Sequence, residues 1–320
     1  MLKRYSLLIT IFTLMSVSKI FGQQDAQFSQ YIFNQMYLNP AYTGIDPEWM
    51  EVSITHRSQW LGYEPTFDDG GAPTTQLLSF SMPLTKYNIG LGAYLMNDQL
   101  GPLRNFEAKL SLAYHFKLNS GATLSLGVRG GLYNQSINFN ELRFVDEDDP
   151  LNIGGNQNQS SSDYTLGLYY NSPTYFGGLS VTHFQESDFS FAEDLSFTSL
   201  STHMNLILGK VFAVSPSIDL TSSVLMKSDF NSYSFEGNLI GEINSKFFIG
   251  ASLRELEAFS AMSGIYFMED NRMRLSYAFD YTIEARNAKA ATSHEIVLSY
   301  RIPSFKFPQK PIIRTPRFRF

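Results

Sequence analysis

Hydrophobic and polar residues alternate position by position through many stretches of the chain. In 106–117, the clearest of them, the apolar positions are Phe106, Ala108, Leu110, Leu112, Tyr114 and Phe116. The positions between them are Glu107, Lys109, Ser111, Ala113, His115 and Lys117. Because successive side chains of a strand point to opposite faces, this period of two predicts a strand with one face against lipid and the other against water.

About fourteen segments of this kind are predicted between Met50 and Ile302. They span 50–62, 74–83, 87–97, 104–117, 122–135, 163–171, 174–184, 199–210, 216–227, 232–242, 245–254, 257–268, 271–283 and 293–302. The even-numbered connections are short and turn-like, whereas the longer odd-numbered ones are 63–73, 136–162, 185–198 and 284–292. Tight periplasmic turns and larger external loops are typical of outer-membrane barrels. The predicted fold is all-β: a transmembrane antiparallel up-and-down β-barrel over 50–302, with about 14 strands and both termini periplasmic.

Aromatic residues are abundant, with 27 Phe and 18 Tyr. Rings near predicted strand ends suit the lipid headgroup region, and these include Tyr87, Tyr164, Tyr170, Tyr233, Tyr266 and Tyr281. The alternative is that the rings fill the core of a soluble β protein, but the chain offers no strong helix to cover an open sheet. No stretch beyond the first 22 residues reaches about 18 apolar residues, so no transmembrane helix is expected.

Residues 1–22 are a predicted signal peptide. Lys3 and Arg4 precede an apolar run from Leu7 to Val17, and Gly22 suits a cleavage site. Export and barrel pattern together predict the outer membrane of a Gram-negative bacterium. The chain carries 24 basic and 30 acidic residues, a net charge of −6 that argues against binding nucleic acid. It has no cysteine, so disulfides and thiolate metal sites are excluded.

Segment 23–49 is rich in amides and aromatics but has no regular period. It lacks the alternation expected of a strand, and it is too apolar for a tail exposed to water. We predict that the segment folds into or under the barrel as a plug. Asn39 and Pro40 are expected to form a turn, and Gly44 is expected to relieve the backbone strain of that turn. The alternative is a disordered periplasmic leader.

Residues 303–320 differ in kind, because they are basic, contain no acid and hold four prolines. Proline disfavours a helix and favours an extended strip, which predicts a basic periplasmic tail. The candidates for docking a periplasmic partner are Lys306, Lys310, Arg314, Arg317, Arg319 and Phe320. Alternatively, Phe320 resembles the final aromatic that barrel-assembly machinery reads, or the tail is unstructured.

The polar face of the strands is predicted to point into the lumen. Its mixed charge suggests ion pairs that brace or plug the interior. The predicted inward residues are Arg57, Gln59, Glu107, Lys109, Arg129, Asn205, Asp219, Glu236, Arg254, Arg274, Asp280 and Glu295.

Two external loops stand out. Loop 136–162 contains an acidic run at 146–149, which either holds calcium or is a solvated surface, and its spacing does not fit an EF-hand. Loop 185–198 alternates acids with Phe189, Phe191, Leu195 and Phe197. These apolar side chains either dock a protein or fold inward over the barrel mouth.

Motifs for catalysis or cofactor binding are missing from the sequence. It contains no G-x-S-x-G, P-loop, G-x-G-x-x-G or H-E-x-x-H pattern. The histidines are scattered over separate predicted strands: His56, His115, His183, His203 and His294. We therefore predict no enzyme activity, no cofactor and no metal site, although barrel enzymes do assemble sites from separated residues.

An ordered set of short motifs near the N-terminus resembles the PorP/SprF family of the type IX secretion system of Bacteroidota. The matching residues are Gln27, Ser29, Gln30, Tyr31, Asn34, Asn39, Pro40, Gly44, Arg57, Gln59, Trp60, Gly71, Ala72, Pro73, Thr75 and Gln76. One departure is the insertion at 64–69, which lengthens the first external loop. These residues form four motifs, at 27–34, 39–44, 57–60 and 71–76. No single motif is specific to the family, but the presence of all four in this order is.

The resemblance implies a non-enzymatic outer-membrane component that supports secretion or surface anchoring of cargo adhesins, including those of gliding motility. Its implied partners are outer-membrane lipid, the C-terminal domain of a secreted adhesin, a periplasmic peptidoglycan-binding lipoprotein and the motor ring. A barrel of about fourteen strands is too narrow to pass a folded adhesin, so docking is expected rather than conduction. The alternative function is a plugged channel for small hydrophobic molecules.

Substitutions on the two faces of 106–117 test the face assignment. Leu110→Arg on the predicted lipid face is expected to destabilise the barrel by roughly 2–4 kcal/mol near the midplane, whereas Lys109→Gln is expected to be mild. Unfolding in lipid vesicles measures both free energies. Equally mild effects would contradict the assignment.

Overall fold

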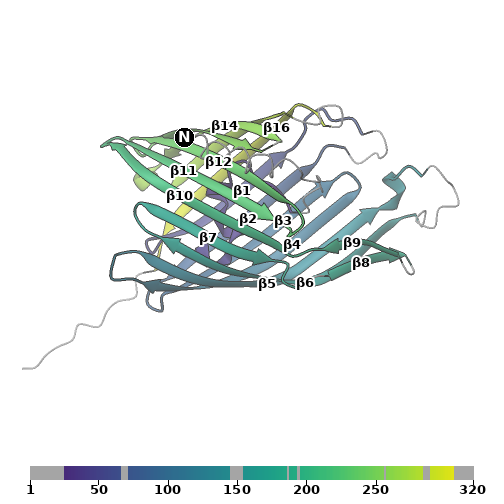
Figure 1. Cartoon of the computed structure of the whole chain (residues 1–320), viewed down its shortest axis with the longest axis horizontal. Coiled ribbons are helices and arrows are strands. Elements are labelled where there is room, and N and C mark those ends of the chain that lie inside the picture. Colours follow the sequence, from purple (N-terminus) through teal and green to yellow (C-terminus); the bar gives the residue numbers. More distant parts are fainter. Residues whose placement is uncertain are drawn as a thin grey trace, which may run out of the picture.

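The computed structural model describes residues 25–65, 71–144, 154–185, 187–192, 195–255, 257–283 and 289–305. Fourteen antiparallel strands form a closed barrel (Figure 1). They are β1 (Trp49–Ser58), β2 (Thr74–Leu84), β3 (Ile89–Leu100), β4 (Leu103–Lys117), β5 (Thr123–Asn138), β6 (Asn156–Asn171), β7 (Tyr175–Thr182), β10 (His203–Ser215), β11 (Ile218–Ser228), β12 (Tyr233–Ile243), β13 (Phe247–Arg254), β14 (Ala258–Phe267), β15 (Met273–Thr282) and β16 (Thr292–Pro303). Each strand pairs with its neighbours in this order, and β16 pairs with β1 to close the wall. The predicted barrel and its strand number are confirmed.

Strand boundaries differ from the prediction mainly at the end of the barrel that carries the long connections. β1 ends at Ser58 rather than residue 62, because Trp60 and Gly62 adopt positive φ angles. β5 and β6 continue into the predicted loop 136–162, as far as Asn138 and from Asn156. Residues 156–162 carry only polar side chains, so this part of the extension lacks the alternation that predicts a strand.

A separate two-stranded sheet forms within the predicted loop 185–198. Its strands are β8 (Ser187–Ala192) and β9 (Leu195–Leu200). Phe189 is buried in a cluster with Tyr133 and Leu200. The sequence allows the apolar side chains of this loop either to dock a protein or to fold inward over the barrel mouth. The burial of Phe189 agrees with the inward alternative. The acidic run 146–149 lies outside the described residues.

The outward face of the wall is apolar. Leu110 is 70% exposed and Leu132 is 60% exposed, and the other apolar residues of the alternating set in β4 are also exposed, except for half-buried Ala108. The intervening Glu107 and Lys109 are buried inside. The face assignment from the sequence therefore matches the structure. Tyr266 is an exception, because its half-buried ring packs inward against Phe248 rather than outward.

Lys109 requires a correction to the expected effect of its substitution. Its ammonium lies 2.6 Å from Glu107 Oε2 and also pairs with Asp163, and all three side chains are at most 3% exposed. Removing one partner of a buried ion pair leaves an uncompensated charge, which costs several kcal/mol. Lys109→Gln is thus not a mild change, and Leu110→Met is the better control for Leu110→Arg.

Among the described residues, the structure contains no helix with the length and apolarity needed to cross a bilayer.

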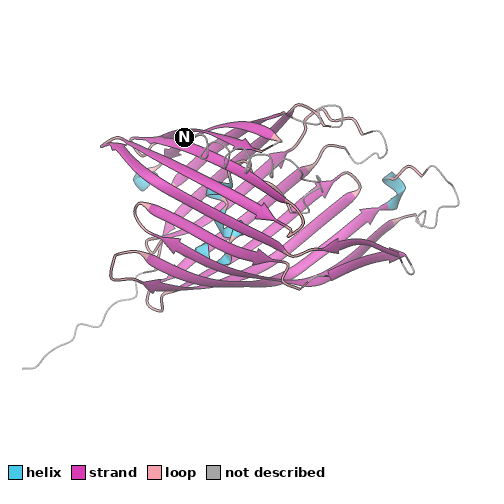
Figure 2. Ribbon diagram, in the orientation of Figure 1, coloured by secondary structure: helices cyan, strands magenta, loops and turns pink. Residues whose placement is uncertain are grey.

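Residues 25–45, here called the lumenal segment, lie inside the barrel (Figure 2). Three short helical turns shape it: η1 (Tyr31–Phe33), α2 (Gln35–Leu38) and η2 (Pro40–Tyr42). Two further turns, η3 (Phe139–Glu141) and η4 (Glu269–Asn271), lie in connections between strands. Apolar side chains of the lumenal segment and the wall form one buried cluster, which includes Tyr31, Tyr37, Leu77, Tyr94 and Tyr169.

Glycines in the wall allow the lumenal segment to approach the strand backbone. A Cβ added at Gly127 would collide with the backbone of Ala41, and one at Gly90 would collide with the carbonyl of Thr43. These positions need glycine because the two backbones are in contact, not because of an unusual φ. The segment is therefore packed directly against the sheet.

Gly127→Ala is expected to destabilise the barrel by about 1–3 kcal/mol, because the added methyl group has no space. Gly237→Ala is the matched control, since a Cβ there meets no atom within 4 Å. Urea unfolding and protease sensitivity of residues 25–45 measure the two effects. Equal behaviour of the two variants would contradict the packing.

Candidate functional site

The lumenal segment and the closing strands share one buried charge network. Arg57 of β1 and Glu295 of β16 are register partners across the seam. The Arg57 guanidinium lies 2.7 Å from Asp280 Oδ2 and 3.2 Å from Glu295 Oε2. The backbone N–H groups of Ser29 and Gln30 donate to the Glu295 carboxylate at 2.8 and 3.0 Å. One cation faces two carboxylates, so these N–H groups supply the remaining compensation for buried negative charge.

Ser29 completes the network with its side chain. Its hydroxyl donates to Asp280 Oδ2 at 2.5 Å and accepts from Arg57 Nη1 at 2.6 Å. The lumenal segment is thus bound to both carboxylates and to the cation. Its removal would leave the charges of the seam incompletely paired.

Asn39 binds the opposite side of the wall. Its amide nitrogen donates to the carbonyls of Leu168 in β6 and Leu179 in β7 at 2.9 and 3.1 Å. These two residues are register partners in the sheet. The Asn39 side-chain oxygen accepts from the Ala41 N–H, which also caps η2. A single side chain therefore fixes both the turn and its place on the wall.

Arg129 of β5 holds the end of α2. Its guanidinium donates to the carbonyls of Tyr37, at 2.6 Å, and Met36. It also lies 4.9 Å from the centre of the Tyr94 ring. Carbonyls at a helix C-terminus lack intrahelical partners, so this arginine satisfies groups that would otherwise be buried and unpaired.

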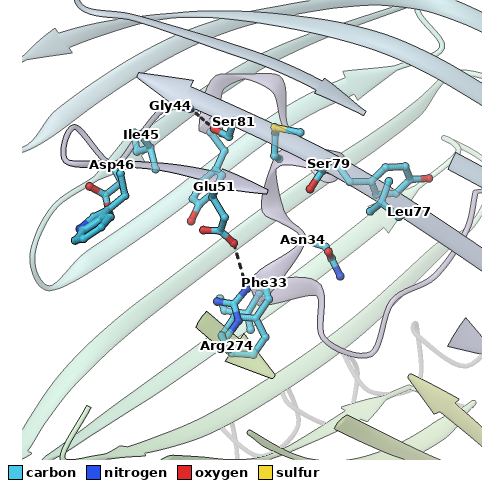
Figure 3. A pocket seen from close by; sticks show the side chains of 15 residues that line it. Phe33, Asn34, Gly44, Ile45, Asp46, Glu51, Leu77, Ser79, Ser81 and Arg274 are labelled. Atoms are coloured by element: carbon cyan, nitrogen blue, oxygen red, sulfur yellow. Dashed lines mark hydrogen bonds and ion pairs between the residues drawn. The ribbon is translucent and has the colours of Figure 1, made fainter. Parts of the chain in front are cut away.

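A cavity of about 260 Å³ lies between the lumenal segment and the strand ends near the short turns (Figure 3). Glu51 and Arg274 form an ion pair at 3.3 Å across it, and Arg274 lies 4.0 Å from the centre of the Phe33 ring. The Gly44 N–H donates to Ser81 Oγ at 2.7 Å. The cavity thus offers aromatic walls together with one charged pair.

The chain leaves the barrel beside this cavity. After β16, the Ser304 N–H donates to Glu48 O and its hydroxyl donates to Pro47 O, both at 2.8 Å. Glu48 directly precedes Trp49, which lines the cavity. The tail candidates Lys306, Lys310, Arg314, Arg317, Arg319 and Phe320 lie outside the described residues.

A third cluster lies at the other end of the lumen. His183 Nε2 is 2.9 Å from Asp25 Oδ1, and His183 Nδ1 is 3.0 Å from Asp163 Oδ2. The His203 ring lies against the His183 ring, with centres 5.8 Å apart. Burial favours the neutral imidazole of His183, but Asp25 and Asp163 outweigh it and raise its pKa to about 10. Burial likewise opposes ionisation of Asp25, yet His183 lowers the pKa of Asp25 below its usual range.

The motif residues divide into two groups: those in the lumen and those that lie away from the charge network. In the lumen, Ser29, Gln30 and Arg57 meet in the charge network, Tyr31 OH lies 2.9 Å from Ser223 Oγ, Thr55 Oγ1 donates to Asn34 at 3.0 Å, and Thr75 Oγ1 donates to Asp98 at 2.6 Å. Half-buried Gln27 and the turn residues Asn39, Pro40 and Gly44 belong to the same segment.

The remaining motif residues lie away from the charge network. The Gln59 N–H donates to Pro73 O at 2.8 Å, and the Trp60 N–H donates to Ser293 Oγ at 3.1 Å. Gly71 and Ala72 precede β2, and Gln76 is on the outward face, where it accepts from Asn97. The motif thus supplies contacts within the structure, and no catalytic grouping emerges from it among the described residues.

The cluster of Asp25, His183 and His203 was missed because its members lie far apart in the sequence. The one available signal was that two histidines bracket the predicted loop 185–198.

Arg57→Gln is expected to destabilise the protein by roughly 3–5 kcal/mol, because it leaves two buried carboxylates without their cation. Arg272→Gln is the control: its partner Asp270 is 63% exposed, and such surface pairs contribute about 0–1 kcal/mol. Unfolding in lipid vesicles measures both. A loss below about 1 kcal/mol for Arg57→Gln would show that the network is not a major source of stability.

Solved structures with a similar fold are outer-membrane barrels. The Ralstonia pickettii toluene transporter TbuX is 11% identical, with a TM-score of 0.53 over 84% of this chain and 93% of its own. The CymD monoaromatic hydrocarbon channel is 13% identical, with a TM-score of 0.52 over 86% and 93%. These likenesses show the fold alone. A search of curated proteins found no match.

The sequence itself matches a protein family over most of its length. The family model for the type IX secretion system membrane protein PorP/SprF covers residues 20–300. Barrel and family together place the chain in the outer membrane, as the sequence predicted. This protein belongs to the PorP/SprF family of type IX secretion system membrane proteins.

Proposed function

We propose that this protein is a non-enzymatic docking component of type IX secretion in the outer membrane. It holds the C-terminal domain of a cargo adhesin on its external side and contacts the periplasmic machinery at its other end. The observation that carries this proposal is a lumen occupied by a hydrogen-bonded segment, in a member of a secretion family. Such a barrel is suited to anchoring a partner rather than passing one.

The interior supports anchoring because its buried charged groups either bind the segment or pair with one another. Arg57 and Arg129 bind the lumenal segment from two strands of the wall, and Asn39 of the segment binds the carbonyls of β6 and β7. A gap between the segment and the wall is lined by Tyr37, Lys109 and other residues. Its volume is about 10 Å³, which is the space of a single water molecule. Buried charges engaged in this way have no free position for a substrate, which is the basis for proposing no catalysis.

The periplasmic end supplies the features that a protein partner needs. The cavity of about 260 Å³ has aromatic walls and the Glu51–Arg274 pair, and the basic tail starts beside it at Ser304. A partner with an apolar side chain for the cavity and acidic residues for the tail fits both. A periplasmic peptidoglycan-binding lipoprotein with links to the motor ring is the partner class we propose there.

The external end supplies the surface for the cargo. The β8–β9 hairpin projects from the ends of β7 and β10 and packs through Phe189 on Tyr133 of β5. This packing gives the hairpin a fixed base on the barrel. We propose that the adhesin C-terminal domain rests on this hairpin and the neighbouring loops.

A channel for small hydrophobic molecules is the competing function. The fold shared with TbuX and CymD does not separate the two, because likeness at this identity extends to the fold alone. A channel needs a continuous path, whereas this lumen is occupied by a segment that Arg57 binds from the wall and that binds the wall through Asn39. We therefore favour docking.

A mild-detergent pull-down from native outer membrane, read by mass spectrometry, tests the proposal. The wild type is expected to recover an adhesin C-terminal domain and a periplasmic lipoprotein. Ser79→Trp, which fills the cavity, is expected to lose at least about 90% of the lipoprotein and keep the adhesin, because a loss of about 1.4 kcal/mol in binding already lowers affinity tenfold.

Leu78→Trp is the matched control on the outward face of the same strand, where the side chain is 43% exposed. It should recover both partners. Recovery of the barrel alone, together with ligand-dependent conductance, would overturn docking in favour of the channel.

A further inference from the structure

The cluster at the external end of the lumen has the donor set of a metal centre. Asp25, His183 and His203 offer ligand atoms that all lie within 4.8 Å of one another. Both histidines are buried, at 2% and 5% exposure. Two imidazole nitrogens and one carboxylate oxygen are a common protein ligand set for zinc and related transition metals, and three protein ligands leave one position open.

Each histidine has an outer partner that orients it toward the centre. His203 Nδ1 lies 2.7 Å from the Ser201 carbonyl, which accepts only from a protonated nitrogen and so leaves Nε2 with its lone pair free. His183 Nδ1 lies 3.0 Å from Asp163 Oδ2 while its Nε2 faces Asp25, so a bound ion replaces the proton that Nε2 directs at Asp25. Metal-bound histidines characteristically have a carboxylate or backbone carbonyl on the other ring nitrogen. The two rings show both versions.

The spacing suits a small tetrahedral ion. Ligand atoms about 2.0–2.1 Å from zinc stand roughly 3.3 Å apart. The observed separations, from 2.9 Å between His183 and Asp25 up to the 4.8 Å limit, bracket this value. A cavity of about 10 Å³ borders Asp25 and His183 on the lumenal side.

We propose that Asp25, His183 and His203 bind one divalent transition-metal ion of the zinc class, with Asp163 and the Ser201 carbonyl as the outer partners. The ion joins the first described residue of the lumenal segment to both ends of the β8–β9 hairpin, because His183 precedes β8 and His203 follows β9. It therefore fastens the external hairpin to the segment that fills the lumen.

Tyr133 of β5 lies between this centre and the hairpin. Its ring packs edge-on against His183 at 6.0 Å, and it is tilted against Phe189 of β8 at 5.8 Å. The hairpin and the proposed centre therefore share one aromatic neighbour. The proposal concerns the purified chain alone and stands whether or not the hairpin docks cargo.

Titration of the full-length, tag-free protein with Co²⁺ and Zn²⁺ after chelator treatment tests the site. Calorimetry is expected to give one equivalent of either ion, and Co²⁺ is expected to show the intense visible absorption of tetrahedral coordination. Hydrogen exchange is expected to slow at residues 25–28 and around 183–203 on binding. Metal analysis of protein purified from its native membrane provides an independent measurement.

His203→Ala is the decisive variant, because it removes one ligand and keeps the contacts of His183 with Asp25 and Asp163. It is expected to weaken binding at least about 100-fold, at the upper end of losses seen when even an outer partner is removed. His56→Ala is the matched control, since His56 is exposed and far from the cluster in the barrel wall. Absence of binding in the wild type, or equal binding by wild type and His203→Ala, would overturn the proposal.

Discussion

The buried contact of Arg57 with Asp280 and Glu295 is the interaction on which the rest of the structure depends. It lies at the seam where β16 closes on β1, and its carboxylates also bind Ser29 and Gln30. Charges removed from water need partners that replace their hydration. The lumenal segment therefore supplies hydrogen-bond partners to the buried charges of the seam and stabilises the closed wall.

The rest of the lumen extends this principle. Gly90 and Gly127 let the backbone of the segment touch the sheet, and Asn39 and Arg129 then satisfy the carbonyls that this contact buries. Polar groups held by several fixed partners rearrange only at high cost. An interior built this way favours a rigid anchor whose two ends present a periplasmic cavity and an external hairpin, which is the arrangement proposed for docking.

Much of the fold was predictable from the sequence because a barrel strand encodes its two environments residue by residue. The alternation in 106–117 predicts the strand and both of its faces, and the same pattern places Arg57, Asp280 and Glu295 on the inward face, although it does not show how they pair. Alternation is absent where both faces of a strand are polar, which is why β6 begins at Asn156, before its predicted start. The prediction from position along the strand is also wrong at Tyr266. Its place near a strand end suggests the headgroup region, but its ring packs against the inward-facing apolar cluster.

The candidate sites were less predictable, because they depend on contacts between distant parts of the chain. His183 and His203 flank the β8–β9 hairpin, and Asp25 reaches them only because the lumenal segment begins at the end of the barrel that carries this hairpin. No local sequence pattern indicates that these three residues lie close together. The short motifs near the N-terminus identified the family, whereas the structure explains their chemistry: Ser29, Gln30 and Arg57 occur together because they share two carboxylates.

Conductance in planar lipid bilayers is the most direct measurement of the central claim that the segment, held by the seam, closes the lumen. The wild-type barrel is expected to show no steady conductance, whereas a variant lacking residues 25–44 is expected to conduct as an open pore. A wild type that conducts as well as the deletion variant would contradict the account.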